Sequence, residues 1–317
     1  MLSRTAENLY WIGRMIERAE TGARLLEVGA RNALIPGVGG GYRNEWDAVL
    51  AAAGTADEFE AKYGDPVQRN VESHMFFDED NPNSVVSCLS RARENGRIVR
   101  TALTGQVWDG LNMAFQELRE MQRTERSQQP LADLVEWTMR ITAQLRGAIG
   151  SAQLRNDGYR FMQIGLDIER ADSTARMLDV KYYVLLPEVS YVGSGLDNYQ
   201  WTTLLRAMSS YRAFSWAYGG EITARKIADF LILNRQSPRS LLTCVASASE
   251  HLDALKRGPG GRTEAQKQVG NLLAELAEAD VTDIFEEGLH EFLTRFTKEI
   301  RILSGAIHGS YLTGRAA

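Results

Sequence analysis

One segment of this 317-residue chain occurs twice, and that repeat limits the folds open to it. Residues 12–28 and 164–180 are identical at ten of seventeen positions, where ordinary composition gives roughly one by chance. Both copies carry Glu-Arg at the same place, as Glu17-Arg18 and Glu169-Arg170. A tandem repeat predicts that the same structural unit is built twice and that the two units pack together.

The match extends well beyond this segment. Five positions recur at an offset of 155, namely Trp46, Leu50, Phe59, Tyr63 and Gly64. Pro82, Ser84 and Cys88 recur at an offset of 156, and residues 147–149 recur at 158. The offset grows from 152 to 158 without a change of order, as small loop insertions would produce. We therefore predict two halves, residues 1–155 and 156–317.

Glycine- and proline-marked breaks divide each half into helices. In the first half the predicted helices span residues 4–33, 44–63, 67–77, 83–103, 106–124 and 131–154. No segment shows the apolar alternation and β-branched enrichment of strands. The sequence thus predicts an all-α bundle of two tandem six-helix halves, related by a pseudo-two-fold axis and packed as one body.

The repeated helix carries a charged stripe beside a narrow apolar seam. The seam has the 3, 4, 3, 4 spacing of a packed helix face and consists of Leu9, Ile12, Ile16, Ala19, Ala23, Leu26 and Ala30. At about 100° per residue, the stripe contains Gly13, Glu17, Glu20, Arg24 and Glu27, and in the second copy Gly165, Glu169, Asp172, Arg176 and Asp179. Arg18 lies about 100° around the helix from Glu17, on a partly apolar face. We expect neighbours on several sides of this helix.

Three interpretations of these charges stay open. The glutamates Glu17 and Glu169 could pair with arginines on neighbouring helices, while Arg18 and Arg170 brace the bundle. Alternatively, the two stripes line a shared groove that binds a peptide or an amino-acid group. The third interpretation is surface pairing at i, i+4, such as Glu20 with Arg24. The glycines Gly13 and Gly165 favour close approach to another group, because glycine costs a helix about 1 kcal/mol relative to alanine.

Composition excludes several classes of partner. The net charge is -5 with acidic and basic residues interspersed, so we expect no nucleic-acid partner. Apolar runs are far shorter than a bilayer requires, and the first residues lack the apolar core of a secretory signal. We expect no membrane association and a cytoplasmic location. Cys88 and Cys244 occupy matching positions, which predicts two buried thiols and no bridge between them.

Signatures of catalysis and of metal binding are missing from the sequence. A di-iron bundle needs two Glu-x-x-His pairs, whereas this chain has one, from Glu287 to His290. The nucleophile, nucleotide-binding and kinase motifs are absent as well. We therefore predict no metal and no cofactor, and we expect His290 to be a surface or interhelical residue.

The segment from Asn8 to Glu20, with the sequence Asn-Leu-Tyr-Trp-Ile-Gly-Arg-Met-Ile-Glu-Arg-Ala-Glu, strongly resembles the opening of the bacterial alpha-E domain family. That family is named for its helical character and its Glu-Arg motif. The resemblance continues in residues 161–178 and covers nearly the whole chain. It assigns the motif to Glu17-Arg18 and Glu169-Arg170. Since Leu166 replaces Arg14 in the second copy, the two copies are not identical sites.

The resemblance also implies a context. Such proteins are similar to components of gene neighbourhoods that encode ATP-grasp amidoligase-like and transglutaminase-like proteins, systems proposed to make or modify peptides through amide bonds. Our leading hypothesis is a non-catalytic scaffold subunit that binds a peptide or partner for such an enzyme. The rival hypothesis is an enzyme acting on peptide or amide substrates, with Glu17 or Glu169 as general base in an open pocket and with a raised pKa. A third is a structural homo-oligomer.

Overall fold

The computed structural model describes residues 2–34, 45–183, 194–255 and 261–312. Within these ranges it contains fifteen α-helices and no strands, so the prediction of an all-α fold is confirmed. No helix in the described ranges combines the length and apolar character needed to cross a bilayer.

The helices of the first 155 residues are α1 (Ser3–Ala33), α2 (Glu45–Ala53), α3 (Ala56–Tyr63), α4 (Gln68–Glu72), α5 (Val85–Ile98), α6 (Gly105–Arg123) and α7 (Leu131–Ala152). Those that follow are α8 (Asp157–Tyr183), α9 (Gly195–Ala207), α10 (Tyr211–Tyr218), α11 (Ala224–Ile232), α12 (Leu241–Ala254), α13 (Glu264–Glu278), α14 (Val281–Glu287) and α15 (Leu289–Ile307). Short π-helical turns, Ser73–Phe77 and His308–Leu312, follow α4 and α15.

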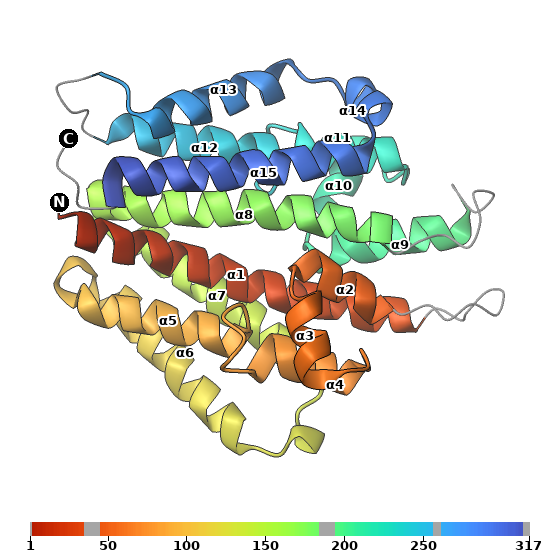
Figure 1. The fold of residues 1–317 in the computed structure, drawn as a ribbon, viewed down its shortest axis with the longest axis horizontal. Coiled ribbons are helices and arrows are strands. Elements are labelled where there is room, and N and C mark those ends of the chain that lie inside the picture. The colour runs from red at the N-terminus through yellow and green to blue at the C-terminus, as the bar shows by residue number, and fades with distance from the viewer. Residues whose placement is uncertain (1, 35–44, 184–193, 256–260, 313–317) are drawn as a thin grey trace.

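The two long helices that carry the repeated segment, α1 and α8, lie side by side and run parallel through the middle of the molecule (Figure 1). On one side of this pair lie α5, α6 and α7, and on the other lie α12, α13 and α15. The seam of α1 is buried from Leu9 to Leu26 and partly buried at Ala30, with Leu9, Ile12 and Ile16 fully inaccessible. The expectation that this helix has neighbours on several sides is therefore confirmed.

The helix boundaries partly correct the predicted ones. The helix expected at 44–63 divides into α2 and α3, because Gly54 adopts a left-handed φ of +67° that an α-helix cannot contain. Residue 44 lies outside the described residues. The helix expected at 83–103 ends at Ile98 and continues as a 3₁₀ turn. The described ranges thus hold seven helices before residue 155 and eight after it, instead of six and six.

Local sequence explains where the two central flanking helices begin. The Ser84 hydroxyl accepts a hydrogen bond from the Ser87 amide at 3.1 Å and caps α5. Ser240 caps α12 in the same way, with the Thr243 amide at 3.1 Å. A proline two residues before each cap cannot continue a preceding helix. These caps fix where α5 and α12 start against α1 and α8.

Candidate functional site

The Glu-Arg pairs of the two central helices bind each other reciprocally. Arg18 of α1 donates to Glu169 of α8 through Nε at 2.7 Å and through Nη2 at 3.0 Å. Arg170 of α8 donates to Glu17 of α1 through Nε at 3.2 Å and through Nη2 at 2.9 Å. Both contacts have the two-point geometry by which a guanidinium holds a carboxylate in one orientation. On each helix Glu and Arg point in different directions, yet both reach the other helix.

Glu169 is held by a second arginine as well. The Nε atom of Arg14 donates to this carboxylate, while its Nη1 donates to the Tyr10 hydroxyl at 2.8 Å and to the Ser304 hydroxyl at 3.0 Å. Burial by itself would raise the pKa of Glu169, but the charges of Arg14 and Arg18 outweigh it and lower the pKa to about 2. Glu169 is therefore a fixed anion at neutral pH.

Glu17 and Glu20 lie in a second, closed cluster. Their side chains have no exposed area, and both carboxylates contact arginines from three other places in the chain. The arginines of this cluster are Arg24, Arg146, Arg170 and Arg239. Burial would raise the pKa of Glu17, but its arginine neighbours hold that pKa below its usual range. With two carboxylates and four guanidinium groups, the cluster carries an excess of positive charge, and Arg146, Arg170 and Arg239 remain partly exposed.

The Glu20–Arg24 pair corrects one interpretation of the sequence. The i, i+4 contact forms, with Arg24 Nε donating to Glu20 Oε1 at 2.9 Å, but both side chains are buried and not at the surface. Arg24 also donates to the Ala207 carbonyl oxygen, which draws it into the interior. Burial and repulsion by Arg239 lower the pKa of Arg24 to about 10. The i, i+4 spacing in the sequence predicts that the two side chains pair, but it does not show whether other helices bury the pair.

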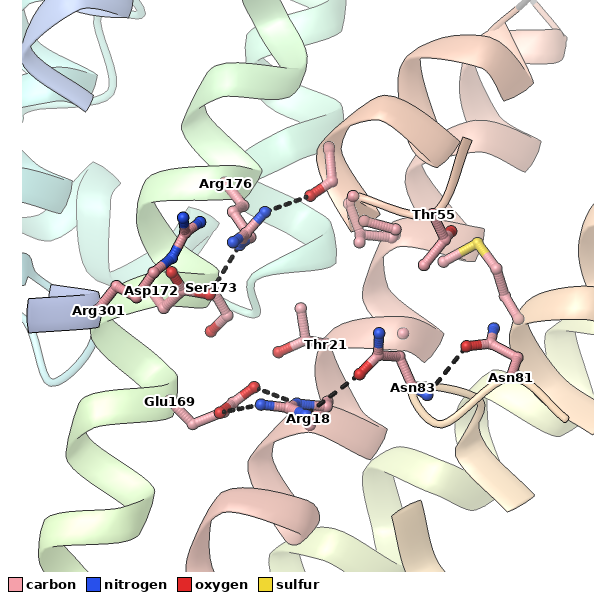
Figure 2. A pocket seen from close by; sticks show the side chains of 16 residues that line it. Arg18, Thr21, Thr55, Asn81, Asn83, Glu169, Asp172, Ser173, Arg176 and Arg301 are labelled. Carbon is pink, nitrogen blue, oxygen red and sulfur yellow. Dashed lines mark hydrogen bonds and ion pairs between the residues drawn. The ribbon is translucent and has the colours of Figure 1, made fainter. Parts of the chain in front are cut away.

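A pocket of about 310 Å³ opens beside the Arg18–Glu169 pair (Figure 2). Its polar walls come from α1, α8, α15 and the segments before α3 and α5, and include Arg18, Thr55, Asn83, Asp172, Arg176 and Arg301. Arg18 Nη1 donates to Asn83 Oδ1 at 3.1 Å. Arg176 donates to Asp172 at 2.7 Å and to the Ala52 carbonyl oxygen at 3.5 Å. These contacts leave the centre of the pocket open.

Two polar groups of this pocket have no partner among the residues that the structure describes. Arg301 forms no ion pair or hydrogen bond there, although its guanidinium lies beside Asp172 and Arg176 in Figure 2. The Thr55 hydroxyl is buried and unbonded, with the residue 3 % exposed. Because the Arg301 side chain is exposed and the Thr55 hydroxyl has almost no accessible surface, the guanidinium is the one of the two groups that a ligand can contact directly.

The eight charged residues singled out by the sequence divide into two sets of four. Arg18, Glu169, Asp172 and Arg176 line the pocket. Glu17, Glu20, Arg24 and Arg170 belong to the closed cluster and are not among the residues that line this pocket. The prediction that both charged stripes line one shared groove is therefore wrong for Glu17, Glu20, Arg24 and Arg170. Arg146 and Arg239 pack against Glu17 and Glu20 and take the place of a groove there.

The two predicted close-approach glycines lie where α1 and α8 cross. A Cβ on Gly13 would overlap the Met162 carbonyl oxygen and stand 2.9 Å from the Leu166 nitrogen. A Cβ on Gly165 would overlap the Tyr10 carbonyl oxygen and stand 3.1 Å from the Arg14 nitrogen. The two backbones touch at this point, so the glycines approach the opposite helix and not a ligand. Their contact brings the Glu-Arg pairs within reach of each other.

Sequence reasoning missed several residues of these networks. Arg146 and Arg239 have no visible link to the motif, and Arg301 lies 132 residues after Glu169. One signal was available: at the offset of 156, Arg239 stands where Asn83 stands in the first half. Asp167 was missed as well; burial raises its pKa to about 7 despite a 2.6 Å hydrogen bond from Ser247.

Neither the motif glutamates nor the two cysteines are in a state that favours catalysis. The rival hypothesis requires a glutamate with a raised pKa, whereas the pKa values of Glu17 and Glu169 are both lowered. The cysteines Cys88 and Cys244 are free and buried, as predicted, and burial raises the pKa of each thiol to about 12. Within the described ranges no three metal-ligating side chains are grouped. His290 is interhelical, with Nδ1 at 2.7 Å from Asp179 Oδ1.

Comparison with known proteins gives one match. The profile of the alpha-E family, described as a predicted alpha-helical domain with a conserved ER motif, matches residues 1–312. The Glu-Arg pairs at 17–18 and 169–170 are the two places in the repeated segment where this dipeptide occurs. No curated protein and no solved structure matches the chain.

Proposed function

The chain belongs to the alpha-E family, and we propose that it is a non-catalytic binding subunit whose pocket at Arg18, Arg176 and Arg301 holds the carboxylate of a peptide. The observation that carries this proposal is the unpaired Arg301 guanidinium at an open pocket whose other charges are already paired.

Charge and shape both favour a carboxylate. Three guanidinium groups face two carboxylates in the pocket, and Glu169 is already neutralised by Arg14 and Arg18. An added anion therefore finds an excess of positive charge. A guanidinium matches the two oxygens of a carboxylate in one plane. A volume of about 310 Å³ suits the end of a peptide.

A binding role agrees with the state of the motif glutamates. A general base must have a pKa near the working pH and reach the substrate. Glu17 is enclosed by arginines, and Glu169 presents both oxygens to Arg14 and Arg18. These carboxylates instead position Arg18 and Arg170 between the helices. The Arg18–Glu169 pair thus forms one wall of the binding site.

For partners, we propose ATP-grasp amidoligase-like and transglutaminase-like proteins. The support is the family resemblance, together with the chemistry of the pocket: an enzyme that forms an amide bond acts on a carboxylate, and a subunit that holds carboxylates can present one. An ATP-consuming partner would place such a complex in the cytoplasm of a bacterium.

We also propose that the two halves, 1–155 and 156–317, arose by tandem duplication and pack about a pseudo-two-fold axis. Reciprocal contacts support this, since Arg24 bonds the Ala207 carbonyl oxygen while Arg176 bonds that of Ala52. When the two halves are compared, Arg239 stands at the position of Asn83. Its side chain occupies the place in the second half that corresponds to the pocket of the first half. One binding pocket per chain is the consequence.

The pocket can be tested with acetyl-tetraalanine as the probe, carrying either a free carboxylate or a C-terminal amide. By calorimetric titration we expect the acid to bind at least about tenfold more tightly than the amide, as a charged hydrogen bond implies. Arg301→Gln should remove this preference. Arg212→Gln, which removes an exposed arginine of α10 outside the pocket, should retain it. Equal affinity for acid and amide would overturn the assignment.

The partner proposal needs a separate experiment. The tagged protein should co-purify with the ATP-grasp-like or transglutaminase-like protein encoded beside its gene, with nucleotide present or absent. A stable complex that turns over no substrate unless the partner is added would support the role of binding subunit. Failure to associate under every nucleotide condition would contradict the partner proposal but would not affect the pocket assignment.

A further inference from the structure

We infer that the arginine pocket is the inner end of a longer groove that holds an acidic peptide of about five residues, with its C-terminal carboxylate innermost. This inference rests on the proposed function of the pocket and extends it to the identity and the direction of the ligand. It is carried by the continuity of three cavities along α15 and by a second unpaired cation on that helix.

The three cavities share lining residues. The arginine pocket and the next cavity have Ala52, Arg176 and Arg301 in common. That second cavity shares Thr294, Thr297 and Arg301 with a third, which opens at His290 and Lys298. Arg301 thus borders all three. In this region α15 and α8 lie side by side (Figure 1). The shared lining residues connect the three cavities into one groove along α15.

The groove has a definable length. From Arg301 to His290, α15 extends over eleven residues, or roughly 16 Å at about 1.5 Å per residue. An extended peptide advances about 3.3 Å per residue, so about five residues span this distance. The arginine pocket receives the terminal carboxylate, because Arg18 borders only this one of the three cavities, whereas Arg176 and Arg301 also border the next one. The chain then leaves toward Lys298.

Charge along the groove favours acidic side chains. Like Arg301, Lys298 has no ion-pair or hydrogen-bond partner within the described ranges, and both residues are exposed. They stand three residues apart on α15, so they project on the same face about 5–6 Å from each other. Two free cations at this spacing match two anionic groups of one ligand, the terminal carboxylate at Arg301 and an acidic side chain at Lys298.

A peptide suits this groove better than a polyphosphate. Acidic residues Asp172, Asp179 and Glu291 lie among the cations, and they disfavour a polyphosphate, which has no N–H groups to donate to them. A peptide carries backbone N–H groups as well as acidic groups, and the carboxylates of the groove can accept hydrogen bonds from these N–H groups. The hydroxyl groups of Thr294 and Thr297 add further polar contacts for a peptide backbone.

The decisive experiment is a length series of acetylated oligoglutamates, from two to eight residues, each with a free C-terminus. Titrated into the full-length protein at low salt, their affinity should rise with length and level off near five residues. Acetyl-pentaglutamate should bind at least about tenfold more tightly than acetyl-pentaalanine, and added salt should reduce the difference. Inorganic tripolyphosphate should compete only weakly.

Two lysine variants separate the outer groove from the pocket. Lys298→Gln should weaken pentaglutamate binding by about fivefold to tenfold and leave acetyl-tetraalanine unaffected. Lys267→Gln, a matched exposed lysine on α13 that borders none of these cavities, should change neither affinity. A flat length series, or equal binding of pentaglutamate by Lys298→Gln and the unaltered protein, would overturn this inference.

The outcomes also distinguish this inference from the proposed function. If acetyl-tetraalanine binds in an Arg301-dependent way while glutamates add nothing, the pocket assignment stands and the acidic groove falls. If neither peptide binds, both fall together. Tighter binding of tripolyphosphate than of any peptide would reject a peptide ligand in favour of a polyphosphate.

Discussion

Arg18 Nε lies 2.7 Å from Glu169 Oε1, joining the arginine of one Glu-Arg pair to the glutamate of the other. Their residues are 151 positions apart, and the reverse contact joins Arg170 to Glu17. The motif is therefore a pair of exchanged ion pairs between α1 and α8. These ion pairs hold α1 and α8 together, and the Arg18–Glu169 pair also borders the pocket.

Replacing Glu169 with glutamine should destabilise the fold. Arg14 and Arg18 would keep their charges in a buried place without a carboxylate, which costs about 3–5 kcal/mol. Urea unfolding followed by circular dichroism measures this loss. Glu94→Gln breaks an exposed pair with Arg97 and should leave the midpoint unchanged. Equal effects of the two variants would contradict a structural role for the exchanged pairs.

Adding a methyl group at the helix crossing should be costly. Gly13→Ala would push the Met162 backbone away from α1, and we expect a loss of about 1–3 kcal/mol or more. Gly147→Ala is the control, because a Cβ there meets nothing within 4 Å and alanine favours a helix by up to about 1 kcal/mol. Thermal unfolding should shift in opposite directions for the two. A stable Gly13→Ala variant would show that the helices can separate freely.

Stability should fall as the pH rises from about 4 to about 7 because of Asp167. Burial raises the pKa of this carboxyl to about 7 in the folded protein, so the folded state keeps a proton that the unfolded state releases near pH 4. The corresponding loss is on the order of 4 kcal/mol. Asp167→Asn should remove this slope in urea unfolding, whereas Asp109→Asn, at an exposed site on α6, should preserve it.

Neither cysteine should react with a thiol reagent while the protein is folded. Cys88 and Cys244 are buried, and burial raises the pKa of each to about 12, which leaves almost no thiolate at pH 8. Ellman's reagent should detect no thiol in the native protein and two after denaturation in guanidinium. Rapid labelling of one cysteine before denaturation would reveal an exposed thiol that the structure does not contain.

The local sequence pattern was sufficient for the all-α class and for the buried face of α1, but not for every helix boundary. The 3, 4 spacing identified the seam of α1 from Leu9 to Leu26, all of which is buried. Glycine at residue 13 indicated close approach, although its neighbour proved to be the backbone of α8. The break at Gly54 escaped notice because a single glycine is often tolerated within a helix, and only its positive φ makes it a boundary.

By itself, the sequence determined an all-α chain, the helix that carries each Glu-Arg pair and the family, because helical periodicity and motifs are local properties. The symmetry of the two halves stays a prediction. Only the tertiary structure decided that Glu17 and Glu20 are enclosed while Glu169 borders an open pocket. The physical reason is that each environment depends on arginines from distant helices: Arg146 and Arg239 fill one site, whereas Arg301 reaches the edge of the other and leaves it open.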